Sequence, residues 1–411
     1  MSSTHTQAAK VAVSGVFVLN GLAFASWVSR VPAIRDTLSL TPGQVGLLLL
    51  CLSAGTAIAL PISGVVVHRL GPARTVATMA AVVTLGLLVM SAGLVTVAIP
   101  LVAAGMVVYG IGTSTWDVAM NVEAADVERR LGRTIMPRFH AGFSAGTVTG
   151  ALLGAAAARV GIDLPYQLIG TAFVVLAVVP LVTRWFTPVP EEDPHAEPKP
   201  SALVAWREPR TLMIGLVVLA FALSEGIAND WVALALVDGH DAGESLAAFG
   251  YALFVSAMTV GRLFGGSVVE RVGRVGTLRV TGLLVTAGVA VVVLSPGLPG
   301  AMVGAVLWGI GASLGFPLGM SAAADDEHRA AARVAVVSSI GYAAFLGGPP
   351  LVGLLADHLG VLQAIVVAAV AGIAGALLAK ATAPTSPPGP TAPGPTGPTS
   401  PGEAAADRRL A

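Results

Sequence analysis

Twelve long apolar stretches run through this chain, and they restrict its possible folds more than any other feature. Each is close to the ~20 residues that a helix needs to cross the apolar core of a bilayer. Backbone groups in lipid must form their hydrogen bonds within the segment, and the runs lack the alternation of a membrane barrel, so helices are predicted. The predicted spans are residues 11–28, 45–67, 76–94, 97–118, 139–158, 165–185, 212–237, 245–269, 278–294, 300–322, 335–356 and 362–379.

The composition agrees with a chain that lies mostly in lipid. Lys, Arg, Asp and Glu make up 11% of the 411 residues, whereas soluble domains carry about 25%. So few charges could not cover the surface of a soluble protein of this size, which argues against a soluble enzyme, a nucleic-acid-binding protein and a disordered regulator. The single cysteine, Cys51, argues against a disulfide framework or a thiolate metal site. We expect no cofactor.

Basic residues predict the orientation of the spans. With the N-terminus in the cytoplasm, only Arg30, Arg35 and Arg159 fall on the outer side. Such a bias follows the positive-inside rule, so the sequence predicts a multi-pass protein of the cytoplasmic membrane with both termini inside. The fifteen basic residues of the inner loops are Arg69, Arg74, Arg129, Arg130, Arg133, Arg138, Arg184, Lys199, Arg207, Arg210, Arg271, Arg274, Arg279, Arg329 and Arg333.

Two polar segments divide the chain. Residues 187–210 are rich in Pro, Glu and Asp and are predicted to form a cytoplasmic linker. They separate an N-terminal half of six spans, residues 1–186, from a C-terminal half of six, residues 211–381. Residues 382–411 form a Pro/Gly/Thr/Ser tail that cannot bury apolar area, and we expect this tail to be disordered.

The two halves resemble each other in sequence. An aromatic-Gly-Ile-Gly pattern and an Ala-Ala-Asp-x-Glu-x-Arg pattern each recur at an offset of 199 residues, at 109–112 and 308–311 and at 124–130 and 323–329. A loop pattern, Gly-x3-His/Glu-Arg-x-Gly, recurs at an offset of 202 residues, at 64–71 and 266–273. Because helix order and loop sides match as well, we expect a parallel repeat about an axis along the membrane normal.

With these patterns the chain, over residues 10–381, resembles the major facilitator superfamily. That family has the signature Gly-x3-Asp-Arg-x-Gly-Arg-Arg/Lys after its second helix. The resemblance implies an all-α membrane protein with twelve transmembrane helices, arranged as two six-helix halves related by a parallel pseudo-two-fold axis. The signature is approximated here by Gly64, His68, Arg69, Gly71 and Arg74, and again by Gly266, Glu270, Arg271, Gly273 and Arg274.

In the family, this loop latches the cytoplasmic side in one conformational state. His68 stands where the family has an acid, so the resemblance implies a carboxylate latch only in the second copy, through Glu270. A loop that only fixes topology is the alternative.

Two signatures of the family's drug and antiport members are absent. Many proton-coupled drug exporters have an arginine in the fourth helix where this chain has Met106, and antiporters carry a Gly-Pro dipeptide in the fifth helix. That helix instead has a four-residue ladder that predicts close helix packing, namely Gly142, Gly146, Gly150 and Gly154.

Polar residues inside the spans are the best guide to mechanism, because a charge in the membrane costs several kcal/mol unless it is paired or hydrated. Glu225 lies close to the middle of the seventh span, Asn229 follows one turn later, and Asn20 lies at similar depth in the first span. We predict that these three face a central cavity between the halves, with Glu225 as the proton carrier. A Glu satisfied by neighbouring helices is the alternative.

Two further polar sets are candidates for gates. Asp117 and Asn121 lie one turn apart in the fourth helix and His140 begins the fifth, which predicts a pH-sensitive inner gate or a polar subsite; solvation at the interface is the alternative. Arg30 ends the first helix, and Asp230 lies in the outer part of the seventh helix, its repeat partner. We predict that the two residues pair when the outside closes. The alternative is simple anchoring at the interface. Arg262 is interpreted as a scaffold residue.

The resemblance implies a secondary active transporter that works by alternating access, with protons as the coupling ion. No nucleotide-binding loop is present. Carboxylates outnumber cations in the spans, which favours a neutral or cationic solute, sugar-like or amine-like. We expect no enzymatic activity, no nucleic-acid partner and a monomer in the lipid bilayer. The alternatives are a proton-driven exporter of drugs or metabolites and a receptor or scaffold that has the transporter fold but moves nothing.

Overall fold

The computed structural model describes residues 3–132, 135–187, 202–326 and 329–384. Within these ranges, eleven helical segments are long and apolar enough to cross a membrane. The longest, α10 (Glu244–Leu294), consists of two helices that meet at Gly273, where φ 76° and ψ 162° interrupt the helix. Counting its two arms separately gives the twelve predicted spans.

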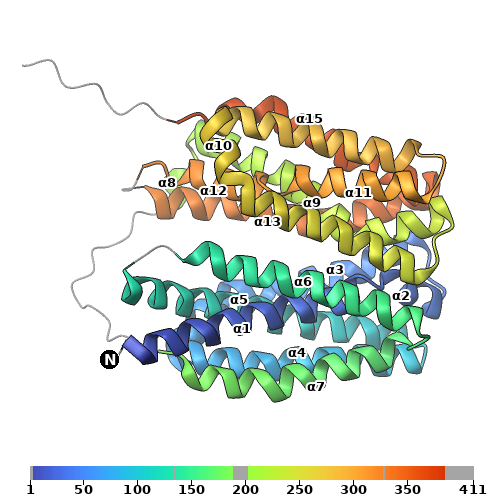
Figure 1. Cartoon of the computed structure of the whole chain (residues 1–411), viewed down its shortest axis with the longest axis horizontal. Helices are drawn as coiled ribbons and strands as arrows, with labels where there is room; N and C mark the ends of the chain where they lie inside the picture. Colours follow the sequence, from blue (N-terminus) through green and yellow to red (C-terminus); the bar gives the residue numbers. More distant parts are fainter. Residues whose placement is uncertain (1–2, 133–134, 188–201, 327–328, 385–411) are drawn as a thin grey trace, which may run out of the picture.

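The helices form two groups of six spans, which Figure 1 shows as two layers. The first group also holds α2 (Val31–Leu38) and a short 3-10 helix (Thr183–Trp185). Its long helices are α1 (Ser3–Val28), α3 (Pro42–Leu70), α4 (Pro72–Val95), α5 (Ile99–Leu131), α6 (Met136–Arg159) and α7 (Leu164–Val182). The second group holds α8 (Ala202–Ala205), α9 (Pro209–His240), α10, α11 (Leu298–Ala312), α12 (Gly315–Ala323), α13 (Ala330–Leu359), α14 (Val361–Ala364), α15 (Val366–Leu378) and a 3-10 helix (Ala379–Thr382).

The same packing pattern occurs in both halves. In the first half α1 packs on α6, and α3 and α4 both pack on α5; in the second half α9 packs on α13, and α10 packs on α11. The halves meet mainly through two helix pairs, α3 with α13 and α6 with α10, which are equivalent under the repeat. The packing therefore agrees with the predicted parallel repeat.

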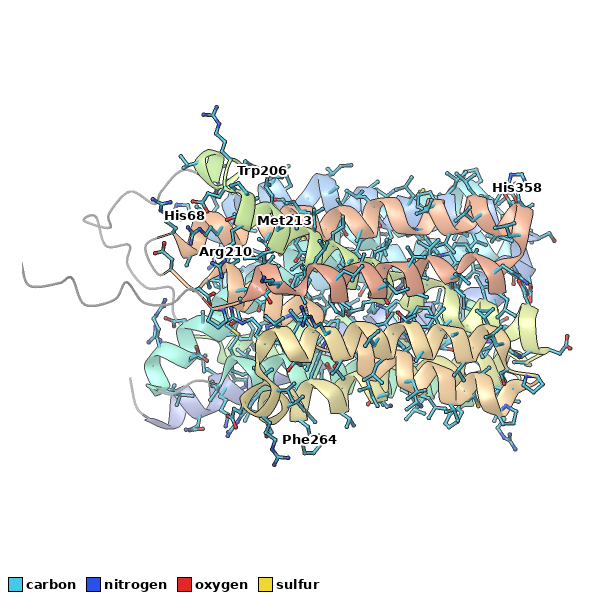
Figure 2. All side chains as sticks on the ribbon, turned by 90° about the horizontal axis from the view of Figure 1, so that it is seen from above. His68, Trp206, Arg210, Met213, Phe264 and His358 are labelled. Atoms are coloured by element: carbon cyan, nitrogen blue, oxygen red, sulfur yellow. The ribbon has the colours of Figure 1, made fainter. Side chains whose placement is uncertain are left out.

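Both ends of the described chain lie at the same end of the bundle, which we call the terminal end (Figure 1). In Figure 2, His68, Trp206 and Arg210 lie at this end, whereas His358 lies at the opposite end, which we call the far end. The cytoplasmic location of the terminal end remains a prediction, and so do the domain boundaries. Most of the predicted linker and tail, residues 188–201 and 385–411, lies outside the described residues.

Glycines bring α1 and α6 into close contact, as their four-residue spacing predicts. A Cβ atom at Gly146 would meet the carbonyl oxygen of Val18, and one at Gly150 would meet the carbonyl oxygen of Leu22. The two backbones therefore touch, and dispersion contacts between them replace side-chain packing.

The loop motif forms the same turn in both copies. Gly71 has φ 76° and ψ 159°, and Gly273 has φ 76° and ψ 162°. Residues with a side chain rarely adopt this positive φ, so glycine is required at both positions. The agreement within a few degrees is structural support for the repeat.

Candidate functional site

A cavity of about 240 Å³ lies between the two halves. Helices α1, α3 and α5 of the first half and α9 and α13 of the second contribute to its wall. Asn229 lines the cavity, in the position predicted for it. The lining residues are Phe24, Leu49, Leu52, Ser53, Thr56, Ala57, Leu60, Thr113, Gly226, Asn229, Asp230, Tyr342, Phe345, Leu346 and Pro349.

Asp230 is the lining residue with a formal charge. Its half-buried side chain makes no hydrogen bond or ion pair with any residue that the structure describes. The neighbouring Asn229 accepts a hydrogen bond from the Tyr251 hydroxyl at 3.2 Å. An unpaired carboxylate therefore faces a largely apolar chamber.

The predicted pair between Arg30 and Asp230 is not formed in this conformation. Arg30, only 2% exposed, binds the Glu244 carboxylate at 2.5 Å and the Gln167 side chain at 2.9 Å. It also donates to the carbonyl of Ile162 at 2.8 Å. The reason is positional: Arg30 follows the end of α1 and reaches sideways to the start of α10, whereas Asp230 lies more than two turns before the end of α9.

Other bonds join the two halves near Arg30, at the far end. Arg35 donates to both carboxylate oxygens of Asp238 at 2.5 and 2.7 Å. The amide of Gly43 donates to Asp357 at 2.9 Å, and the Ser245 hydroxyl donates to the carbonyl of Ala155 at 2.9 Å. Because Asp238 is two helical turns beyond Asp230 on α9, these bonds close the cavity on the far side.

Glu225 forms an ion pair instead of standing alone in the cavity. Both its carboxylate oxygens accept from the Arg262 guanidinium, at 3.0 and 3.2 Å. Arg262 also donates to the carbonyl of Ser313 at 3.3 Å. Arg262 is thus the direct partner of Glu225, a contact that its interpretation as a scaffold residue did not include. The role of Glu225 as a proton carrier stays a prediction.

Asn20 is buried within the first half rather than exposed to the cavity. It is 2% exposed, accepts from the Thr113 hydroxyl at 3.0 Å, and places its amide 3.8 Å from the Met120 sulfur. Thr113 does line the cavity, so Asn20 supports the wall through it. Among the hydrogen bonds of the described residues, none joins Asn20 to Glu225 or Asn229.

The second polar cluster is only partly assembled. The Asn121 amide donates to the Asp117 carbonyl at 2.9 Å and to its carboxylate at 3.3 Å. His140 instead packs edge-on against Phe17, with ring centroids 5.3 Å apart, and no hydrogen bond to another described residue joins it to the pair. His140 does lie within electrostatic reach of Arg262 in the other half.

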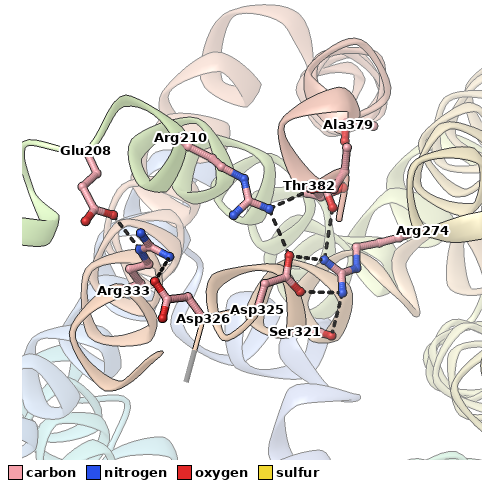
Figure 3. A network of polar contacts seen from close by, with 10 residues as sticks. Glu208, Arg210, Arg274, Ser321, Asp325, Asp326, Arg333, Ala379 and Thr382 are labelled. Carbon is pink, nitrogen blue, oxygen red and sulfur yellow. Dashed lines mark hydrogen bonds and ion pairs between the residues drawn. The ribbon is translucent and has the colours of Figure 1, made fainter. Parts of the chain in front are cut away.

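The second copy of the loop motif takes part in a network at the terminal end (Figure 3). Arg274 binds both oxygens of Asp325 at 2.9 and 3.0 Å, and Arg210 binds the same carboxylate at 3.0 Å. Both arginines also hold the end of the described chain, through the carbonyls of Thr382 at 3.1 Å and Ala383 at 2.8 Å. Burial opposes ionisation of Asp325, but the hydrogen bonds from Arg274 and Arg210 outweigh it and lower the pKa of this carboxyl.

The acid that binds the motif in this conformation is therefore Asp325, from the repeated Ala-Ala-Asp pattern. Glu270 is exposed and binds no residue that the structure describes. The predicted latch through Glu270 is not formed in this conformation.

The first copy of the motif is arranged differently. Asp126, the repeat equivalent of Asp325, binds Arg129 at 2.5 Å and Arg130 at 2.6 Å on its own helix. It also accepts from the Thr187 hydroxyl at 2.7 Å. The motif arginines Arg69 and Arg74 are exposed and bind none of the described residues. The absence of a carboxylate latch from this copy stays a prediction.

Glu208 belongs to a second network that the sequence did not reveal. It accepts from Arg333 at 2.6 Å, Arg329 at 3.0 Å and the Thr211 hydroxyl at 2.8 Å. The hydrogen bond from Arg333 is the largest influence and lowers the pKa of Glu208 to about 2, against the opposing effect of burial. Glu208 lies in the polar segment before α9, which contains several acids. No sequence motif distinguishes Glu208 from the others.

Comparison with known proteins places these features in a family. The family model described as Major Facilitator Superfamily matches residues 13–326 and 214–408. An uncharacterised transporter of Sinorhizobium fredii is 34% identical over 84% of this chain and 90% of its own length. An uncharacterised MFS-type transporter of Yersinia pestis is 32% identical over 86% of this chain and 92% of its own.

Solved structures of similar shape are transporters as well. A mutant of the nucleoside transporter NupG has a TM-score of 0.75 at 13% identity, covering 91% of this chain and 98% of its own. A bacterial homologue of the human lysosomal transporter Spinster has a TM-score of 0.74 at 16% identity, covering 93% and 98%. The E. coli fucose:proton symporter FucP, also a mutant, has a TM-score of 0.64 at 15% identity, covering 91% and 98%. At these identities the likeness shows the fold alone.

Proposed function

We infer that this chain, which belongs to the major facilitator superfamily, moves a small organic solute across the cytoplasmic membrane by alternating access. The observation that carries this proposal is the cavity that both halves line and that bonds between the halves close at the far end. Rocking of the halves about the α3/α13 and α6/α10 contacts would break these bonds and expose the cavity to the far side.

The terminal end is proposed to face the cytoplasm. The positive-inside bias supports this orientation. Arg210 and Arg274, two of the fifteen basic residues of the predicted inner loops, lie in the terminal-end network. Arg30 and Arg35, two of the three predicted outer ones, lie at the far end. Both termini then lie in the cytoplasm, and the bonds that join the halves at the far end lie on the outer side.

Proton coupling is proposed to run through carboxylates of α9. Glu225 is paired with Arg262 at 3.0 Å, so a proton on Glu225 would release Arg262 and change the electrostatics of the wall. Asp230 has no such partner among the residues that the structure describes, so it can exchange a proton for a ligand contact. Two differently partnered acids on one helix are suited to coupling proton and solute movements.

The test begins with a ligand-stabilisation screen of the purified protein across sugars, amines, amino acids and antibiotics, because a bound ligand raises the melting temperature by mass action. Ligands found this way are then tested for uptake into liposomes under an imposed pH gradient. We expect Glu225→Gln to abolish proton-driven uptake and to spare counterflow, whereas Asp163→Asn, at an exposed far-end acid, leaves both unchanged. Proton-driven uptake that survives in Glu225→Gln would reject this carrier.

A proton-driven exporter of drugs or metabolites is the second candidate. The apolar wall of the cavity favours it, since Leu49, Leu52 and Leu60 suit a lipophilic solute. Met106 in place of the exporters' arginine counts against it. A protein that binds ligands but moves none of them under any gradient would be the receptor or scaffold instead.

A further inference from the structure

We propose that the cavity recognises a small organic cation, an amine with an apolar body whose ammonium group binds the Asp230 carboxylate. This names the substrate class of the proposed transporter and rests on that proposal. Three features of the wall carry it: an uncompensated negative charge, hydroxyl groups that are already bonded, and an aromatic surface beside the charge.

Among the described residues that line the cavity, Asp230 is the one with a formal charge. The preceding acid on α9, Glu225, is paired with Arg262. At the far-end closure, Arg30 is paired with Glu244 and Arg35 with Asp238. A carboxylate in a poorly hydrated, apolar chamber costs several kcal/mol unless a counter-charge meets it. A cationic ligand supplies that counter-charge, whereas an anionic solute would add to the cost.

The hydroxyls of the wall are largely committed to the protein. Ser53 donates to the carbonyl of Phe345 at 2.7 Å, and Thr113 donates to Asn20 at 3.0 Å. Thr56 donates to the carbonyl of Gly110 at 3.4 Å. A sugar must exchange many water hydrogen bonds for protein ones, and unmet polar groups are penalised. With these three hydroxyls engaged, the Tyr342 hydroxyl and the Asn229 amide are the lining side-chain donors that bind no acceptor among the described residues. They are fewer than a polyol would use, whereas the Asp230 carboxylate can accept from one charged group.

An aromatic surface completes the site. Tyr342 and Phe345 of α13 lie with ring centroids 6.3 Å apart, and Phe24 lines the cavity from the other half. Aromatic faces attract ammonium groups and pack against apolar bodies. The volume of about 240 Å³ is below the roughly 300–1,000 Å³ of drug-sized sites, so the amine is small.

The experiment compares amines with neutral and anionic molecules of nearly the same shape. Phenethylamine is paired with phenethyl alcohol and phenylacetate, and tryptamine with tryptophol and indole-3-acetate. Calorimetry on the purified full-length protein measures the affinities. We expect at least one amine to bind about tenfold or more tighter than its alcohol, as a charge-assisted bond of about 1.5–3 kcal/mol predicts. The acids should bind no better than the alcohols.

Variants assign the effect to the carboxylate. Asp230→Asn should weaken amine binding about tenfold and change alcohol binding little, Asp230→Glu should retain most of the amine affinity, and Asp163→Asn should behave as wild type. Since the Asp230 side chain makes no hydrogen bond to a described residue, the isosteric amide breaks none of these contacts. Amine affinity that equals alcohol affinity for both pairs, or that survives unchanged in Asp230→Asn, overturns the proposal.

Uptake of the same probes into liposomes separates this inference from the proposed function. An amine that binds through Asp230 but is not moved under any gradient supports the cation site and refutes transport. A sugar or an acid that is moved, while no amine binds through Asp230, supports transport and refutes the cation site.

Discussion

The far-end ion pairs should set the balance between the observed conformation and one that opens at that end. Glu244→Gln removes the charge that faces Arg30 and keeps the size of the side chain. Arg30 is 3% exposed in this pair and Glu244 is 34% exposed. A charge-assisted hydrogen bond contributes about 1.5–3 kcal/mol, and solvent around Glu244 reduces the net loss to about 1 kcal/mol.

A loss of about 1 kcal/mol changes the ratio of far-end-closed to far-end-open molecules roughly fivefold. Asp238→Asn weakens the pair with Arg35, whose side chains are 15% and 30% exposed, by a similar amount. The two pairs share no residue, so their effects should add. The double variant should lose about 2 kcal/mol, a change of roughly thirtyfold.

Distances between spin labels test this prediction. Cys51, the single cysteine, is first replaced by Ala, and labels are placed at Thr37 on α2 and Leu246 on α10, both exposed. Each far-end variant should gain a longer-distance population, and the double variant the larger one. Asp241→Asn, at an exposed far-end acid, is the control. A double variant whose distance distribution superposes on that of this control would refute the reasoning.

Two further predictions concern stability. Because the pKa of folded Glu208 is about 2 against an ordinary 4.5, its stabilising effect is present above pH ~4.5 and is lost as the pH falls towards ~2. Glu208→Gln should therefore lower the melting temperature near neutral pH and flatten the dependence of that temperature on acid pH, whereas Glu270→Gln should do neither. An unchanged pH profile in Glu208→Gln would count against the network. Gly146→Ala should destabilise by about 1–3 kcal/mol, because the added Cβ meets the Val18 carbonyl. Gly170→Ala, with nothing within 4 Å of the added Cβ, should have little effect, and equal melting temperatures for the two glycine variants would disprove the packing argument.

The sequence predicted the positions of the spans because lipid requires long apolar runs whatever their neighbours are. It predicted a loop between the eighth and ninth spans, where Gly273 interrupts α10, because the loop motif that follows the second span recurs there. It did not predict the hydrogen-bond and ion-pair partners of the polar residues. Successive residues of a helix are rotated by about 100° about its axis, so the depth of a residue in the membrane does not fix the direction in which its side chain points. Asn20 has the predicted depth but points to Thr113. Arg30 binds Glu244, which lies just before the eighth predicted span, where a search for charges within spans does not reach.

The two ends of the bundle satisfy their charges in different ways, and this has a consequence for switching. At the terminal end, Asp325 and Asp126 bind arginines of their own halves, so those bonds survive when the halves move apart. At the far end, the pairs centred on Arg30 and Arg35 cross between the halves, so rocking must break them. In the proposed mechanism, a state that opens at the far end would replace them with contacts across the terminal end, or with ligand and proton contacts in the cavity. A cation that binds Asp230 more tightly in that state than in the observed one would offset part of this cost, because a ligand shifts an equilibrium only by its difference in affinity for the two states.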